Sequence, residues 1–267
     1  MPLLIEPNEL EQLLDKPDVV VVDLCKAKQY VQGHIPGAHF INYMDIVHID
    51  KPVMGLLPDA DSFSRLVSKL GIVANTRVIA YDDEGGGCAS RFIWTLNVFG
   101  HENASLLNGG LYSWANEGHP LNNQEPAHVE PSGYALNNTG RYTADRDYIL
   151  QHLNDKNTVL LDARSAAEFS GEKRFADKAG HIPGAIHFEW TDGMDRNNNL
   201  RLLPEDVIEQ RLEQLGISKD KEVICYCQSH HRSAFSCLML KHLGYKNVKG
   251  YPGSWSDWGN QADTPVE

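Results

Sequence analysis

The chain has 267 residues and a formal net charge of −12 at pH 7, and its length suits two domains better than one. Hydrophobic residues make up 42% of the sequence and charged residues 22%, which excludes a disordered chain and suits packed domains. The acidic balance argues against nucleic acid or an anionic membrane surface as a partner.

The N-terminal sequence and the cysteine content both bear on the cellular compartment. The first residues, MPLLIEPNELEQLL, place glutamates among the leucines and lack the basic start and unbroken apolar run of a secretory signal. No stretch approaches the roughly 18 apolar residues of a membrane span. The five cysteines are an odd number in a long chain, which disfavours a disulfide framework. We therefore expect a cytoplasmic protein with no membrane partner and with free thiols.

Predicted strands and helices alternate along the chain. Short apolar runs are typical of strands buried on both faces of a parallel sheet, and apolar stripes that end in Leu-Gly predict helices with a glycine stop. In chain order these are strand Val19–Val22, helix Phe63–Leu70, strand Val78–Tyr81, strand Val159–Leu161, helix Val207–Leu215 and strand Val223–Tyr226. The alternation predicts α/β domains, each a parallel β-sheet flanked by helices.

The sequence contains an internal repeat. Val19–Asn42 is echoed by Thr158–Trp190, and both segments contain an Asp followed by GHIPGA. The strand that ends VIAY and its loop DDEGGGCAS are echoed by VICY and the loop CQSHHRS. A third echo pairs NGGLYSWANEGHPL with GYPGSWSDWGN. The order is the same in both halves, so a tandem duplication of one fold is predicted.

A segment between the two copies has the composition of a linker. Asn122–Gly140 is rich in Asn, Pro and Gly and has no apolar periodicity. We therefore expect an N-terminal domain over residues 1–121, a linker over 122–140 and a C-terminal domain over 141–267. The candidate nucleophile, Cys227, has a counterpart that is not a cysteine in the first half, so the C-terminal domain is expected to be catalytic and the N-terminal domain catalytically inactive.

The candidate nucleophile is Cys227, at the end of the last predicted strand. The loop that follows leads into an apolar helix, so backbone N–H groups and the helix N-terminus can converge on the sulfur and lower its pKa. The loop also carries His230, His231 and Arg232, a cationic cluster suited to attracting an anion. A buried structural cysteine followed by a solvated basic turn is the alternative.

The two copies differ where chemistry is expected. Aligning Tyr81 with Tyr226 places Asp82 opposite Cys227, so the first half has no equivalent nucleophile. Likewise Arg164 lies opposite Cys25. Divergent residues are the functional candidates, and shared ones are expected to form the fold; the shared residues are Asp23, Asp162, His34 and His181.

The paired strand-Asp and GHIPGA segments, the strand–Cys–loop–helix and the closing GSWSDW resemble the tandem-domain rhodanese family over almost the whole chain. The loop CQSHHR resembles that of bacterial-type thiosulfate sulfurtransferases in this family. The resemblance implies a persulfide on Cys227, and Arg164 in the position that holds the anionic end of the donor. It also implies a donor and persulfide site formed by the loop residues, which are Gln228, Ser229, His230, His231, Arg232 and Ser233.

The resemblance further implies ping-pong sulfur transfer from thiosulfate to cyanide or another thiophile, with no metal or organic cofactor. A small-molecule donor and a thiophilic acceptor are the expected partners, and a protein sulfur acceptor is left open. The nearest alternative is 3-mercaptopyruvate as donor, and a persulfide-carrying binding module is another. A phosphatase is disfavoured because four residues, not five, separate Cys227 from Arg232. A metal site from Cys225, Cys227, His230 and His231 lacks a second ligand pair at suitable spacing.

Overall fold

The computed structural model describes residues 2–267, which form two compact units. Unit 1 contains the chain up to Ile46, Pro58–Thr139 and Met194–Leu202. Unit 2 contains Val47–Leu57, Gly140–Gly193 and the chain from Leu203 onward. Each unit therefore includes a short segment from the other half of the sequence.

Unit 1 is built on a five-stranded parallel sheet with the strand order β1-β7-β6-β2-β3. Its strands are β1 (Leu4–Ile5), β2 (Val19–Asp23), β3 (His39–Phe40), β6 (Arg77–Tyr81) and β7 (Ala104–Leu107). Its helices are α1 (Pro7–Glu11), α2 (Ala27–Gln32), η1 (Tyr43–Ile46), α3 (Ala60–Lys69), α4 (Gly87–Val98) and α5 (Gly110–Asn116). The antiparallel pair β10 (Met194–Asp195) and β11 (Arg201–Leu202) comes from the second half of the chain.

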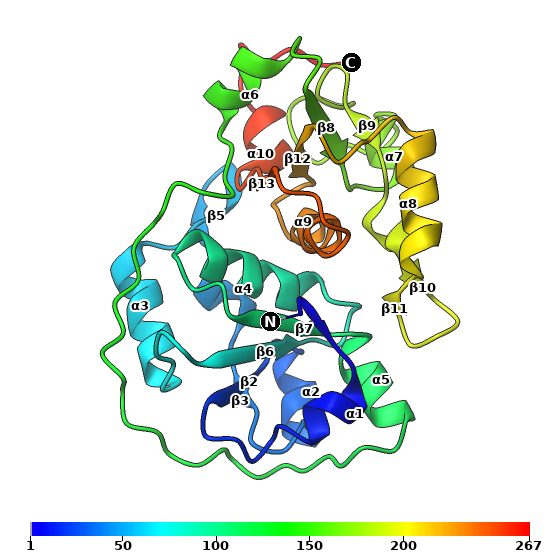
Figure 1. Ribbon diagram of the computed structural model, residues 1–267. Coiled ribbons are helices and arrows are strands. Elements are labelled where there is room, and N and C mark those ends of the chain that lie inside the picture. Colours follow the sequence, from blue (N-terminus) through cyan, green and yellow to red (C-terminus); the bar gives the residue numbers. More distant parts are fainter. Residues whose placement is uncertain (1) are drawn as a thin grey trace. The chain divides into compact units, whose positions relative to one another are not determined.

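Unit 2 is built on a four-stranded parallel sheet with the strand order β13-β12-β8-β9. Its strands are β8 (Thr158–Asp162), β9 (Ile186–His187), β12 (Glu222–Tyr226) and β13 (Val248–Gly250). Its helices are α6 (Arg146–His152), α7 (Ala166–Phe169), η2 (Trp190–Gly193), α8 (Glu205–Gln214), α9 (Arg232–His242) and α10 (Ser254–Trp258). The antiparallel pair β4 (His48–Asp50) and β5 (Val53–Leu56) comes from the first half of the chain, and β5 packs against α10 (Figure 1).

The predicted elements and fold class are confirmed. All four predicted strands lie in the two parallel sheets, and the predicted helices are α3 and α8. Gly71 and Gly216, which follow them, have φ of +70° and +75°, the left-handed conformation in which glycine ends a helix at little cost. The two halves fold alike because their apolar patterns are alike.

The segment predicted as a linker contains no helix or paired strand of the main sheets and belongs to unit 1 (Figure 1). It is fixed there by hydrogen bonds from Ser132 N to Ser68 O and from Leu136 N to Ser64 Oγ. The compact units also differ from two consecutive stretches of chain by the exchanged pairs β4–β5 and β10–β11. In residues 2–267, none of the helices has the length and hydrophobicity needed to cross a bilayer.

The shared GHIPGA histidines have contacts within their own units. The ring of His34 hydrogen-bonds the carbonyls of Tyr30 and Gln124, and the ring of His181 bonds that of Phe169. These contacts are consistent with the fold-forming role expected from their presence in both copies.

Candidate active site

The candidate nucleophile lies at the carboxyl end of β12, where the strand passes into the loop that precedes α9. Cys227 is only 1% exposed. The loop, residues 227–231, is closed by Arg232 at the start of α9. His230 within it has φ of +52°, a conformation that L-residues rarely adopt. The tight loop therefore turns its backbone around the sulfur.

Hydrogen bonds from the start of α10 hold this loop in place. Ser254 Oγ accepts the N–H groups of Cys227, at 3.3 Å, and of His230, at 3.0 Å. The N–H groups of Trp255 and Ser256 donate to the carbonyls of Cys227 and Gln228, each at 2.9 Å. The segment GSWSDW thus determines the shape of the loop that surrounds the thiol.

The surroundings of Cys227 favour its thiolate. Burial alone raises the pKa of this thiol, but the positive charge of Arg232, two hydrogen bonds from Ser233 and one from the Ser229 N–H outweigh it. The pKa therefore lies below its ordinary value. A buried thiol stabilised as an anion by backbone N–H groups and a cation is a reactive nucleophile.

Arg232 is held beside the loop by an ion pair. Its Nη1 and Nη2 donate to the two carboxylate oxygens of Glu168 at 2.7 and 2.8 Å. Burial raises the pKa of Glu168, yet Arg232 and Ser165 lower it to about 2. Glu168 is thus ionised at neutral pH and fixes the guanidinium in a bidentate geometry. This pair places the cation whose charge acts on Cys227.

The structure separates the loop histidines that the sequence grouped together. His230 is 0% exposed, and its Nδ1 lies 2.8 Å from Ser233 Oγ. His231 is partly exposed, with its ring centroid 6.0 Å from that of Trp190. Gln228 donates from Nε2 to the Phe175 carbonyl. Of the two imidazoles, only that of His231 has solvent-accessible surface from which to attract an anion.

Arg164 lies buried inside unit 2, and its contacts are with other groups of the same unit. Its guanidinium donates from Nε and Nη2 to the Asp162 carboxylate, at 2.6–3.0 Å, and from Nη2 to the Gly180 carbonyl at 2.8 Å. It also stacks 4.4 Å above the Trp255 ring and is 1% exposed. These contacts hold Arg164 in a buried ion pair between β8 and α10; its expected role in holding the anionic end of the donor stays a prediction.

Three of the remaining cysteines have surroundings that disfavour the thiolate. Burial, followed by the charges of nearby carboxylates, raises the pKa of Cys25 and Cys88. Burial and a hydrogen bond with Cys237 raise that of Cys225. Cys225 therefore hydrogen-bonds with Cys237 inside unit 2.

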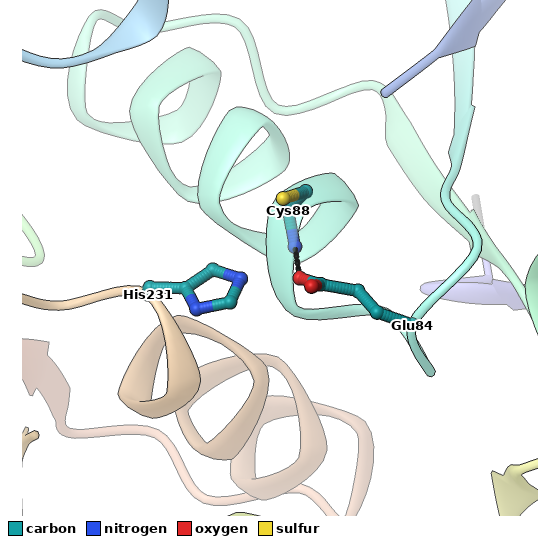
Figure 2. A group of neighbouring side chains, drawn as sticks. All are labelled: Glu84, Cys88 and His231. Carbon is teal, nitrogen blue, oxygen red and sulfur yellow. Dashed lines mark hydrogen bonds between the residues drawn. The ribbon is translucent and has the colours of Figure 1, made fainter. Parts of the chain in front are cut away.

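The corresponding loop of unit 1 is already occupied by one of its own side chains. The Asp82 carboxylate accepts the N–H groups of Glu84, Gly86 and Ala89 at 2.8–3.1 Å. Glu84 in turn accepts the N–H of Cys88 at the start of α4, as Figure 2 shows. This loop holds a permanent carboxylate where unit 2 has a thiol.

Sequence reasoning missed Ser254 and Glu168. Leu111 N donates to Asp82 O just as Trp255 N donates to Cys227 O, so Ser254 corresponds to Gly110 of the first half. That divergence between the copies was a usable signal for Ser254. Glu168 could not be found in this way because its partner, Arg232, is 64 positions away in the sequence.

Comparison with known proteins agrees with this geometry. The Rhodanese-like domain matches residues 6–117 and 145–261. Thiosulfate sulfurtransferases of Azotobacter vinelandii and Pseudomonas aeruginosa are each 46% identical over the full chain and 97% of the relative. The sulfur carrier protein TtuD of Thermus thermophilus is 32% identical over 99% of this chain and 96% of TtuD.

Solved structures share the fold at lower identity. The crystal structure of YnjE has a TM-score of 0.88 at 22% identity, with 99% of this chain and 68% of that chain covered. Wild-type EanB gives the same score and identity, with coverage of 99% and 69%. Both the sequence matches and the two similar parallel-sheet units lead to one conclusion: the chain belongs to the rhodanese family and carries two rhodanese-like domains in tandem.

Proposed function

We propose that this protein is a thiosulfate sulfurtransferase that works through a persulfide on Cys227. The observation that carries the proposal is the set of groups around this thiol: the N–H groups of Ser229 and Ser233 and the charge of Arg232 favour its anion. The full-length similarity to two thiosulfate sulfurtransferases supports the choice of donor.

The reaction has two steps. The Cys227 thiolate attacks the outer sulfur of thiosulfate, and the bond between the two donor sulfurs breaks with its electron pair leaving on sulfite. The new persulfide is an anion, which the loop N–H groups and the α9 N-terminus stabilise. Cyanide or another thiophile then attacks the terminal sulfur and regenerates the thiolate.

Loop residues supply the donor site in this proposal. Arg232 is the charged group beside the thiol, with 21% of its side chain exposed, and His231 adds a partly exposed imidazole. Gln228 and Ser229 follow Cys227 directly in the chain, and the Ser229 N–H hydrogen-bonds to the sulfur. Ser233 hydrogen-bonds to the sulfur directly, and its hydroxyl also contacts Nδ1 of His230 within the loop.

A protein sulfur acceptor fits the same site, because a relative at 32% identity is named a sulfur carrier protein. A cytoplasmic location is supported by the five free cysteines, since thiols of this kind persist in a reducing compartment.

Intact-mass spectrometry tests the proposal directly. After incubation with thiosulfate the protein should gain about 32 Da, one sulfur atom, and lose it again on addition of cyanide. Cys227→Ser should gain nothing. A wild-type protein that gains no sulfur from thiosulfate but does so from 3-mercaptopyruvate would replace the proposed donor.

A further inference from the structure

The hairpin β4–β5, residues 47–57, is the part of the N-terminal half that belongs to unit 2. Its two strands pair antiparallel, with His48 opposite Leu56 and Asp50 opposite Val53. No step of the proposed reaction uses this hairpin. Its contacts nevertheless lie next to the loop that surrounds Cys227.

The closest of these contacts is between backbones. A Cβ added to Gly55 would lie 2.0 Å from the carbonyl oxygen of Ser229 and 2.7 Å from its carbonyl carbon. Gly55 also has φ of +73°. The hairpin therefore runs against the catalytic loop at a residue where only a glycine fits. Ser229 is the residue whose N–H group hydrogen-bonds to Cys227.

A second contact reaches the loop through α10. Met54 N donates to Ser256 Oγ at 2.8 Å, and Ser256 N donates to the Gln228 carbonyl at 2.9 Å. Two consecutive hairpin residues, Met54 and Gly55, are thus connected to two consecutive loop residues, Gln228 and Ser229. A loop held from two sides keeps its N–H groups in one orientation without reorganisation during the reaction.

We infer that the β4–β5 hairpin is a positioning element of the active site: through Gly55 and Met54, the catalytically inactive half of the chain fixes the loop peptides that point at the Cys227 sulfur. This rests on the proposed role of Cys227. In this inference the hairpin acts on the reaction through the geometry of residues 228–229, with which Gly55 and the Met54–Ser256 contact connect it.

The test is Gly55→Ala in the full-length protein, with Gly184→Ala as the matched control. Gly184 has the same φ of +73° and belongs to the same unit, but an added Cβ there meets nothing within 4 Å. Both variants pay the cost of placing alanine in the left-handed region. Only Gly55→Ala pushes the hairpin against the loop.

Two measurements are made on each variant: the pH midpoint of Cys227 alkylation by iodoacetamide, and the rate of sulfur loading by thiosulfate at pH 6.5. Gly55→Ala should raise the midpoint by about one unit and slow loading by up to about tenfold, because a smaller fraction of the thiol is then ionised. Gly184→Ala should shift the midpoint by less than about 0.3 unit and change the loading rate by less than about twofold. Equal behaviour of the two variants in both measurements would overturn the inference.

Alkylation needs no sulfur donor. Its pH midpoint therefore tests the positioning role of the hairpin even if the wild type accepts no sulfur from thiosulfate. If circular dichroism shows that Gly55→Ala does not fold, the same two measurements are made on Ser256→Ala instead. It removes the hydroxyl that accepts Met54 N–H but keeps the backbone bond to Gln228. The midpoint should rise in the same direction, with about threefold slower loading; unchanged values in this variant would also overturn the inference.

Discussion

The loop 82–86 of unit 1 and the loop 227–231 of unit 2 have the same backbone setting and opposite electrostatics. Each follows a buried parallel strand, precedes a helix and has its first carbonyl capped by an N–H group from the third repeat segment. In unit 1, burial and the charge of Glu84 raise the pKa of Asp82. In unit 2, Arg232 and the loop N–H groups outweigh burial and lower the pKa of Cys227.

The comparison shows that the backbone N–H groups of this loop stabilise an anion in both units. The neighbouring side chains determine whether that anion is an unreactive carboxylate or a nucleophilic thiolate. Asp82 fills the unit 1 loop with its own carboxylate and accepts three N–H groups. Cys227 instead provides a thiolate that can attack a sulfur atom of the donor and form a covalent bond with it. A cation in place of a carboxylate next to the loop lowers the pKa of that thiol and so favours the thiolate.

Replacing Cys227 with Asp makes the catalytic loop resemble the inactive one and should have the largest effect. Turnover of thiosulfate and cyanide should fall by at least about a thousandfold, because the nucleophile is lost. The loop should accommodate the carboxylate as the first one does, so the thermal midpoint should stay close to that of Cys227→Ser. Residual turnover above this level would show that another thiol carries sulfur.

The second difference between the copies is Arg164, which stands where the first half has Cys25. Arg164→Met should destabilise the protein by about 3 to 5 kcal/mol, since it leaves the buried Asp162 carboxylate without its partner. The loading rate of the folded fraction and its dependence on thiosulfate concentration should hardly change. Denaturant titration and stopped-flow loading measure the two quantities; a large rise in the half-saturating thiosulfate concentration would show that Arg164 holds the donor.

Removing the cation of the catalytic loop should make its electrostatics resemble those of the inactive loop. The double variant Arg232→Gln, Glu168→Gln avoids leaving either charge unpaired. It should raise the pKa of Cys227 and slow loading about tenfold at pH 6.5, with the difference from wild type shrinking as the pH rises and the variant's thiol also ionises. Loading followed from pH 5.5 to 9.5 checks this, and a pH-independent difference would mean that Arg232 acts by contact with the donor alone.

The same ion pair should affect stability at low pH. Because the folded-state pKa of Glu168 is depressed to about 2, its stabilising contribution is present above the unfolded value near 4.5 and is lost as pH falls through 2. Glu168→Gln should therefore cost on the order of 2 kcal/mol at pH 6 and less at pH 3. Urea unfolding at both pH values measures this, and a constant cost would argue against the ionised pair.

The smallest effect is expected from the inactive loop itself. Asp82→Asn keeps the size of the side chain and removes its charge, and turnover should stay within about twofold of wild type. The control is Cys227→Asp, which changes the equivalent position of the other loop. A loss of turnover comparable to that control would show that the unit 1 loop takes part in catalysis.

Much of this comparison could be predicted from the sequence. The apolar runs predicted the strands because parallel strands buried on both faces need them, and the repeat singled out Cys227 against Asp82. What could not be predicted was the direction of side chains. Arg164 turns inward to Asp162 and His230 turns to Ser233, because packing against distant segments decides which polar group is buried.

The hairpins were missed for a related reason. β4 and β5 span three and four residues, too few to show a period, and their partners are far away in the sequence. The Met54–Ser256 contact joins positions 202 apart. No local pattern distinguishes a turn that packs on its own half from one that packs on the other.

The exchange of hairpins has a consequence for how the chain is made. Unit 1 needs residues 194–202 and unit 2 needs residues 47–57 together with the end of the chain. During synthesis from the N-terminus, about three quarters of the polypeptide must therefore be made before the last segment of unit 1 is available. A gene cut at codon 140 would yield two fragments that each lack a piece carried by the other. The two repeated halves therefore cannot be separated at the linker without each unit losing one of its own segments.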